Sequence, residues 1–200
     1  MTPHIIYFDL ETTGLNYYHD RIIEVAAQDN ARSEPFARLA HTEGSPLPAI
    51  ITRITGITDA KLETEGISEE EALRTFKRYC GSTRKPVYLV AHNNEGFDRW
   101  FLCSRMQQYG IRIPPNWRFF DSLQLAKMLF AKRDHYSLQS LCKDFGIQQI
   151  EAHRAGDDVR CLRAVTERLF HIWNARNAPT SSTSSVENAM EVVWQQTQLV

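Results

Sequence analysis

Residues 5–15 limit the fold of this chain more than any other stretch, because they form an apolar run that carries two acids. The run is rich in Ile, Tyr, Phe and Leu, which favours a buried β-strand. Side chains two apart on a strand point to the same face, so Asp9 and Glu11 would lie together. Two carboxylates in a partly buried place repel each other unless a cation lies between them. The run therefore predicts either a solvated acidic turn or half of a site for a hard cation such as Mg²⁺ or Mn²⁺.

The composition is that of one globular domain with a hydrophobic core. Of the 200 residues, 42% are hydrophobic and 24% are charged, and the formal net charge is −1. Without an overall positive charge, any contact with nucleic acid must come from a local patch. The four cysteines lie far apart, which indicates packing residues in a reducing compartment and neither a disulfide framework nor a zinc site. There is no apolar run of about 18 residues and a strand begins near the N-terminus, so we expect a soluble intracellular protein of the cytoplasm or nucleus.

Three strand patterns followed by alternating helices and strands predict an α/β domain with a mixed sheet. The expected strands lie within residues 5–15 and at 21–28, 34–41, 87–92 and 118–121. The expected helices lie within 48–57 and 68–81, and at 97–110, 122–130, 137–145 and from 154 onward. Ser68 and Glu71 have the spacing of a capping box, which makes the second of these helices a clear prediction.

The chain divides into a domain at residues 1–176 and a polar tail at 177–200. The tail begins with Asn, Ser and Thr, which is typical of a flexible linker. Its later part holds four apolar residues at helical spacing, namely Val186, Met190, Val193 and Trp194. A short C-terminal helix is therefore an alternative to a frayed end. We expect removal of the tail to leave fold and catalysis intact, because the motifs described below end before it.

A third acid, Asp98, directly follows the predicted strand at 87–92 and opens a helix. Sites of α/β proteins usually lie beyond the carboxyl ends of such strands, so we expect the carboxylate of Asp98 to face that end of the sheet. The alternative is an ordinary acid in the first turn of a helix, stabilised by the helix dipole.

The last acidic cluster combines His153 with Asp157 and Asp158, at the start of the final helix. Asp158 falls on the apolar stripe that faces the core, so we choose it over Asp157 as the ligand. The spacing would let the imidazole of His153 overhang a carboxylate-bound metal. The alternative is a surface histidine.

Taken in order, Asp9-x-Glu11-x-Thr13, Asn94-x-x-Phe97-Asp98 and His153-x4-Asp158 resemble the three exonuclease motifs of the DEDDh family. The resemblance covers about residues 4–172. Asp98 lies five residues after Asn93, and this spacing is most similar to that of the three-prime repair exonucleases.

This resemblance implies an RNase H-like fold, an α/β architecture with a central mixed five-stranded sheet flanked by helices. It also implies that Asp9, Glu11, Asp98 and Asp158 hold two Mg²⁺ or Mn²⁺ ions about 3.5–4 Å apart. His153 would then take the proton from the attacking water. Asp121 is similar to a recurring aspartate of the family, which we interpret as structural.

The family likeness extends to the substrate. The backbone after the first motif would meet the 3′ end and a leucine would wedge against the terminal base, which here assigns Thr12, Thr13, Gly14 and Leu15. For Leu15, ordinary packing beneath a loop is the alternative. We expect the substrate to contact Asn93 and Asn94 as well. A further binding surface for stacking and phosphate contact would consist of Tyr17, Tyr18, His19 and Arg21.

The sequence thus predicts a 3′–5′ exonuclease that releases nucleoside 5′-monophosphates from single-stranded or frayed DNA. An exoribonuclease or oligoribonuclease of the same family is the nearest alternative, because the motifs do not report contacts to a 2′-hydroxyl. An inactive nucleic-acid-binding scaffold or a phosphatase is less consistent with the complete set of motifs. Partners would be DNA or RNA 3′ ends and, by resemblance, a second copy in a homodimer through the third strand.

Overall fold

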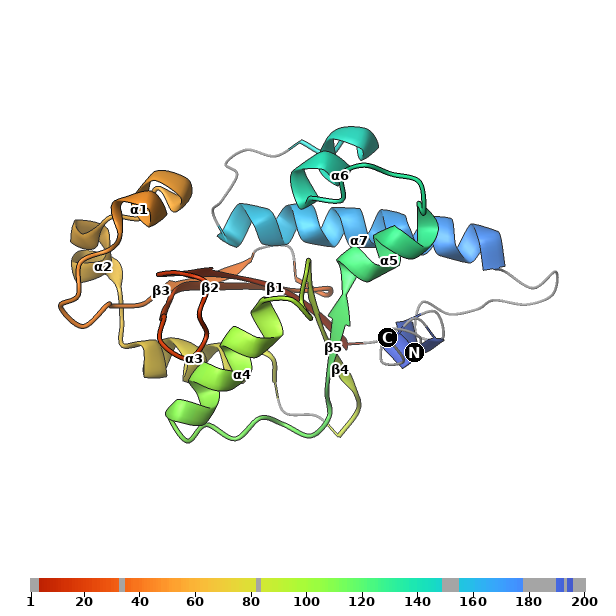
Figure 1. Cartoon of the computed structure of the whole chain (residues 1–200). Coiled ribbons are helices and arrows are strands. Elements are labelled where there is room, and N and C mark those ends of the chain that lie inside the picture. Colours follow the sequence, from red (N-terminus) through yellow and green to blue (C-terminus); the bar gives the residue numbers. More distant parts are fainter. Residues whose placement is uncertain are drawn as a thin grey trace.

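A computed structural model describes residues 4–32, 35–81, 84–148, 155–177, 190–192 and 194–195. Its centre is a five-stranded sheet in the order β3-β2-β1-β4-β5 (Figure 1). The strands are β1 (His4–Thr12), β2 (Ile22–Asp29), β3 (Phe36–Leu39), β4 (Val87–Ala91) and β5 (Trp117–Asp121). β1, β4 and β5 run parallel, whereas β2 pairs antiparallel with β1 and with β3. The expected mixed five-stranded sheet of an RNase H-like fold is confirmed.

Helices cover both faces of the sheet, as Figure 1 shows. They are α1 (Ala49–Thr55), α2 (Asp59–Glu65), α3 (Glu69–Tyr79), α4 (Asp98–Gln108), α5 (Ser122–Leu129), α6 (Leu138–Phe145) and α7 (Ala155–Asn177). One face packs against α5, α6 and α7, and the other packs against α3 and α4. A small third cluster joins α2 to β2 and β3 through Ile23, Leu39, Ile57 and Leu62, and Ile51 of α1 packs against it. Because helices cover both faces of the sheet, the ends of the strands are the places left open for a functional site.

The alternation along β1 decides which helix meets the first two acids. Ile5 and Tyr7 belong to the core on the α7 face, whereas Ile6, Phe8 and Leu10 belong to the core on the α3 and α4 face. Asp9 and Glu11 continue the first series, so the pleat carries both toward α7. The register between β1 and β2 shifts between Glu11 and Thr12, and β1 ends just beyond the acids.

Local signals in the sequence start and stop most helices where expected. The hydroxyl of Ser68 accepts the backbone N–H of Glu71 at 3.1 Å, and Ser137 accepts that of Ser140 at 3.2 Å. Gly146 ends α6 in the left-handed conformation, with φ 65°. The expected helix at 48–57 is shorter, because Gly56 ends α1 with φ 69°. Helix α2 was not expected, although Thr58 caps it by accepting the N–H of Lys61 at 3.2 Å.

The third strand is also shorter than expected. β3 spans only Phe36–Leu39, and Ala40 forms an isolated bridge with Ile67. The expected first residue of the strand, Glu34, lies outside the described residues. Among the described residues, no helix has both the length and the apolar character needed to cross a membrane.

Part of the tail packs on the domain. Residues 190–192 and 194–195 are helical, and Met190 is fully buried in the core on the α7 face. The carboxylate of Glu191 accepts the hydroxyl proton of Tyr88 at 2.7 Å and pairs with Arg118. The expected linker and two of the four apolar residues, Val186 and Val193, lie outside the described residues.

Candidate active site

A cleft of about 300 Å³ opens where β1 and β4 end and α4, α6 and α7 begin. Its lining comes from four separate parts of the chain. These residues are Asp9, Leu10, Glu11, His92, Asn93, Phe97, Asp98, Ser137, Leu138, Gln139 and Asp158. The cleft thus lies at the carboxyl ends of the parallel strands, where α/β proteins usually bind ligands.

Three of the predicted acids meet in this cleft. One carboxylate oxygen from each of Asp9, Glu11 and Asp158 lies within 4.8 Å of those of the other two. β1 contributes the first two, and the first turn of α7 contributes Asp158, which is buried. Helix α7 is held against β1 by Val159 and Leu162, which belong to the same core cluster as Ile5 and Tyr7. The structure therefore brings together residues that the sequence places at opposite ends of the domain.

The acids disfavour one another's charged forms. Burial raises the pKa of the Asp9 carboxyl well above its usual range, and the carboxylates of Asp98, Glu11 and Asp158 raise it further. Oxygen donors that repel each other at this distance suit a hard divalent cation, which would offset their charge. The donor set consequently fits the magnesium or manganese that the motifs imply.

Asp98 lines the same cleft but stands slightly apart from the three clustered carboxylates. It is buried, and burial is the main reason why the pKa of its carboxyl is raised well above the usual range. The backbone N–H groups of Asp98 and Leu10 bond to this carboxylate and oppose the shift. Its position at the start of α4 brings it into the cleft, where its charge raises the pKa of Asp9.

Two neighbouring residues were missed by the sequence reasoning. Glu24 is a buried acid on β2 directly opposite Glu11, and its charge also raises the pKa of Asp9. His92 lines the cleft, with Nδ1 2.9 Å from Ser122 Oγ and Nε2 2.6 Å from the carbonyl oxygen of Tyr136. Burial lowers the pKa of His92, and the two contacts fix the orientation of its ring. The sequence did offer a signal for each residue. Glu24 is a lone acid within an apolar strand, and His92 is a polar residue at the end of one.

The turn after β4 is held by Asp121 and Asn94. Asp121 accepts the backbone N–H groups of Asn93 at 3.0 Å, Glu95 at 3.2 Å and Leu123 at 2.8 Å, which supports its structural interpretation. Asn94 is fully buried, and its amide nitrogen donates to the carbonyl oxygens of Leu89 and Phe120. Asn93 lines the cleft in the left-handed region, with φ 73°. A direct contact of either asparagine with substrate stays a prediction.

The loop after β1 presents Leu15 to solvent, with 84% of its surface exposed. Asp20 ties this loop together by accepting the N–H of Asn16 at 2.8 Å and the hydroxyl proton of Thr13 at 3.2 Å. Thr12 is buried and donates its hydroxyl proton to the carbonyl oxygen of Gly14 at 2.5 Å. Leu15 is thus not packed beneath the loop, which removes the alternative considered for it.

The structure does not place the two remaining predicted residues, Arg21 and His153, in the cleft. Arg21 pairs with Glu43 at 2.7 Å, so its charge is already engaged within the protein. His153 lies outside the described residues, as do residues 149–154 around it.

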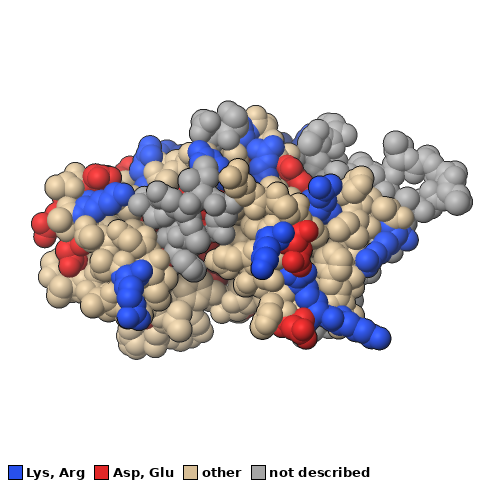
Figure 2. Space-filling view, turned by 90° about the horizontal axis from the view of Figure 1, so that it is seen from above, with Lys and Arg blue, Asp and Glu red and all other residues tan. Residues whose placement is uncertain are grey.

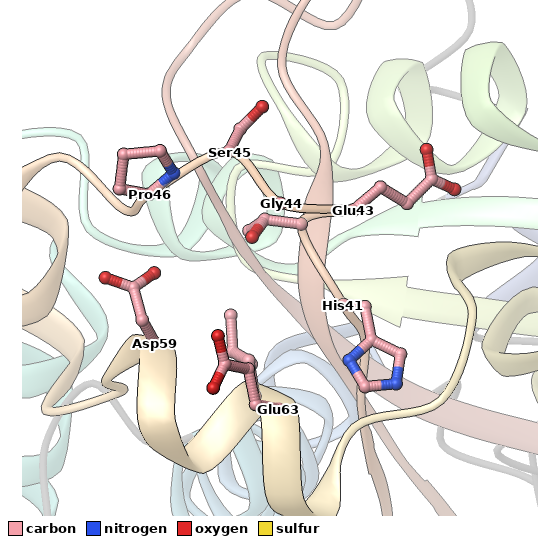
Figure 3. A pocket seen from close by; sticks show the side chains of 9 residues that line it. His41, Glu43, Gly44, Ser45, Pro46, Asp59 and Glu63 are labelled. Carbon is pink, nitrogen blue, oxygen red and sulfur yellow. The ribbon is translucent and has the colours of Figure 1, made fainter.

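A larger cavity of about 480 Å³ lies beside α2 and carries acids of its own. Asp59 and Glu63 extend from α2 toward the loop of Gly44, Ser45 and Pro46, while Glu43 points away (Figure 3). The carboxylate of Asp59 accepts the N–H of Leu47 at 2.8 Å. Across the part of the chain that the structure describes, only Asp9, Glu11 and Asp158 form a group of three potential metal ligands.

The surface agrees with the low net charge. Figure 2 shows basic and acidic side chains interspersed on the face that carries α6 and α7. A mixed surface of this kind gives no strong overall field for a polyanion.

Comparison with known proteins assigns the chain to a family that agrees with the resemblance seen in the sequence. The family model RNase_T, described as an exonuclease, matches residues 6–166, a range that includes all four predicted acids. The exonuclease DPD1, chloroplastic/mitochondrial, of Arabidopsis thaliana is 36% identical over 183 residues, which are 82% of this chain and 55% of DPD1. A PolC-type DNA polymerase III of Halalkalibacterium halodurans is 34% identical over 184 residues, 86% of this chain and 12% of that protein. The chain thus spans about half of the first relative and a small part of the second.

Solved structures support the fold. The zinc-bound complex of Escherichia coli exonuclease I with single-stranded DNA aligns with a TM-score of 0.73 and 20% identity, covering 88% of this chain and 41% of exonuclease I. A moderately thermophilic exonuclease I from Methylocaldum szegediense aligns with a TM-score of 0.72 and 20% identity, with 88% and 41% coverage.

Proposed function

This chain belongs to the exonuclease family, and we propose on that basis that it is a metal-dependent 3′–5′ exonuclease acting on single-stranded or frayed DNA. It would hydrolyse the last phosphodiester bond and release a nucleoside 5′-monophosphate. The observation that carries the proposal is the meeting of Asp9, Glu11 and Asp158 within 4.8 Å at the carboxyl end of β1. A purely structural domain gains nothing from carboxylates that repel one another, whereas a site for divalent cations needs their oxygens as ligands.

The proposed metal ligands are these three carboxylates together with Asp98, which lines the same cleft. Two bound Mg²⁺ or Mn²⁺ ions would supply positive charge that activates water and stabilises the leaving 3′ oxygen. The residues of the chain contribute position. β1 and α7 fix three carboxylates through the shared core, and α4 brings the fourth.

The proposed preference for unpaired ends rests on Leu15. Its side chain is exposed at the tip of a loop that Asp20 holds in shape. An exposed apolar side chain on a loop held in this way can stack against a terminal base, and unpairing that base in a duplex costs a few kcal/mol. The solved complex of exonuclease I contains single-stranded DNA, which supports the same class of substrate here.

A gel assay tests the proposal directly. A 5′-labelled 20-residue DNA and an RNA of the same sequence would be incubated with Mg²⁺, Mn²⁺ or EDTA. We expect stepwise shortening from the 3′ end with either metal, none in EDTA, and faster shortening of DNA. Faster shortening of RNA would replace the proposal with the exoribonuclease alternative, and activity in EDTA would contradict the assignment of the acids.

Neighbouring acids give a matched control. Asp158→Asn should abolish cleavage, because it removes a proposed ligand. Asp157→Asn should leave it nearly unchanged, because Asp157 pairs instead with Arg160 at 2.9 Å. Equal losses in both variants would show that the choice of Asp158 is wrong.

We further propose that His153 acts as the general base, since a neutral imidazole accepts a proton near pH 7. His153→Ala should lower kcat by about 10²–10⁴-fold and remove the rising limb of the pH–rate profile. The exposed His171 on α7 is the control, because its replacement should leave both unchanged. A profile that keeps its rising limb in His153→Ala would assign that limb to another group.

Three finer assignments also remain predictions. These are membership of the three-prime repair subgroup, a homodimer through β3, and a location in the cytoplasm or nucleus. β3 is an edge strand of the sheet, so pairing of two copies there is geometrically open. Sedimentation of the purified protein tests the dimer.

A further inference from the structure

An exposed group of aromatic rings lies beside the loop that carries Leu15. It consists of Tyr17 and Tyr18 from that loop and Trp100 from the first turn of α4, and is called here the aromatic platform. Tyr18 is 65% exposed and Trp100 is 45% exposed. The Tyr17 ring stacks on that of Trp100, with centroids 6.2 Å apart and planes at 27°, and its centroid lies 4.4 Å from that of Tyr18.

The fold holds these rings in place. Trp100 Nε1 donates to the carbonyl oxygen of Glu95 at 2.8 Å, which fixes one edge of the indole. The hydroxyl of Ser104 donates to the carbonyl oxygen of Tyr17 at 2.9 Å, so α4 and the loop are joined. The Tyr17 ring meets that of Phe101 nearly at right angles, with centroids 6.3 Å apart. Binding to the platform would consequently require little additional ordering.

The platform is linked to the cleft by a series of packed rings, of which that of Phe101 is fully buried. Phe97 lines the cleft and packs on Phe101, with ring centroids 4.7 Å apart, and Phe101 in turn contacts Tyr17. Along the chain, Trp100 follows Asp98 by two residues, and Tyr17 follows Leu15 by two. A strand whose 3′ end occupies the cleft and that leaves on the side of Phe97 would meet these rings.

The chemistry of the platform suits bases better than phosphates. Arg99 lies against the platform, with the guanidinium carbon 5.4 Å from the Trp100 ring centroid. Both oxygens of Glu95 accept from Arg99, at 2.9 and 2.8 Å, so that charge is already neutralised. What remains available is aromatic surface, and every nucleobase has a face that can stack on it.

We propose that the aromatic platform binds bases of a single strand on the 5′ side of its 3′-terminal nucleotide. This inference rests on the proposed function and adds a second, length-dependent contact to it. Trp100 and Tyr18 act as binding residues that hold the strand without touching the reacting bond. The platform therefore favours longer single strands over dinucleotides.

The test is the affinity of 5′-fluorescein-labelled oligo(dT) of two, four, eight and twelve nucleotides, measured by anisotropy with Ca²⁺ in place of Mg²⁺. Trp100→Ala should weaken binding of the eight- and twelve-residue strands by about 5- to 100-fold, the range found for loss of base stacking. Binding of the dinucleotide should change less than about twofold. Trp100→Phe should restore most of the loss, because it keeps a ring.

Two further measurements separate stacking from other causes. The dependence of affinity on salt should keep its slope in Trp100→Ala, because no phosphate contact is removed. Tyr18→Ala should show the same length dependence, and it guards against a folding defect in Trp100→Ala because its ring is mostly exposed. Met128→Ala, which removes a 47% exposed apolar side chain on α5, should change nothing.

Each result decides the proposal. An equal loss at all lengths would assign Trp100 a structural role, and no loss at any length would exclude the platform as a binding surface. A changed salt slope would replace stacking with a phosphate contact. If the wild-type protein shortens DNA but its affinity does not depend on length, the platform fails and the proposed exonuclease stands. If the wild-type protein neither binds nor shortens DNA, the proposed function itself fails.

Discussion

Replacement of Gly14 by alanine tests how the loop that presents Leu15 is held. An ideal Cβ at position 14 would lie 2.4 Å from Oδ2, 2.7 Å from Cγ and 2.8 Å from Oδ1 of Asp20. No real Cβ approaches a carboxylate so closely, so the side chain of Asp20 must move away. It would then lose its bonds from the N–H of Asn16 and the hydroxyl of Thr13.

The size of the effect follows from these two bonds. A hydrogen bond to a charged group contributes about 1.5–3 kcal/mol, and the exposed loop argues for the lower end of that range. Alanine in place of glycine stabilises by about 0.4–1 kcal/mol through the unfolded chain. Gly14→Ala should therefore lower the free energy of unfolding by about 1–3 kcal/mol. With the loop no longer fixed, kcat/KM on single-stranded DNA should fall as well.

A double-mutant cycle measured by urea unfolding is the decisive assay. Asp20→Ala alone removes the same two bonds and should destabilise by a similar amount. In that background Gly14→Ala should cost almost nothing, because the clashing carboxylate is gone. Gly156→Ala on α7 is the matched control and should be neutral or stabilising, since its added Cβ would meet nothing within 4 Å apart from its chain neighbours and the backbone of its own helix. If Gly14→Ala costs the same with and without Asp20, the reasoning is refuted.

Three other perturbations have expected outcomes. The raised pKa of Asp9 means that, in EDTA, the folded protein binds more protons than the unfolded chain between about pH 4 and the raised pKa, so stability falls as pH rises through this range. Asp9→Asn should therefore raise the Tm measured in EDTA at neutral pH, while abolishing metal-dependent cleavage. A lowered Tm would contradict this. Glu69→Gln should destabilise by about 3–5 kcal/mol in urea, because it leaves the buried Arg105 without its charge partner; a loss below 1 kcal/mol would show that the pair is replaceable. Met190→Ala should lower the free energy of unfolding by about 2–5 kcal/mol, whereas replacement of the 41% exposed Val192 by alanine should lower it by less than about 0.5 kcal/mol. The expected loss at Met190 would mean that the tail is not dispensable for stability. Equal effects of the two variants would mean that the tail segment does not pack as described.

The sequence by itself determined the features that depend on neighbours a few residues away. The alternation along residues 5–11 placed Asp9 and Glu11 on one face, since a strand repeats every two residues. Ser68 and Ser137 started helices because each hydroxyl reaches an N–H three residues on. The order of the three motifs indicated the exonuclease family, and the family model agrees.

Only the tertiary structure decided which distant residues meet. The apolar stripe of α7 predicted that Asp158 faces the core, but the packing of α7 on β1 brought it within 4.8 Å of Asp9 and Glu11. The same holds for the stacking of Trp100 on Tyr17, the close approach of Asp20 to Gly14, and the burial of Met190. The physical reason is that each of these contacts joins separate elements, whose relative positions follow from the packing of the whole core and from strand register, which no local pattern of residues specifies.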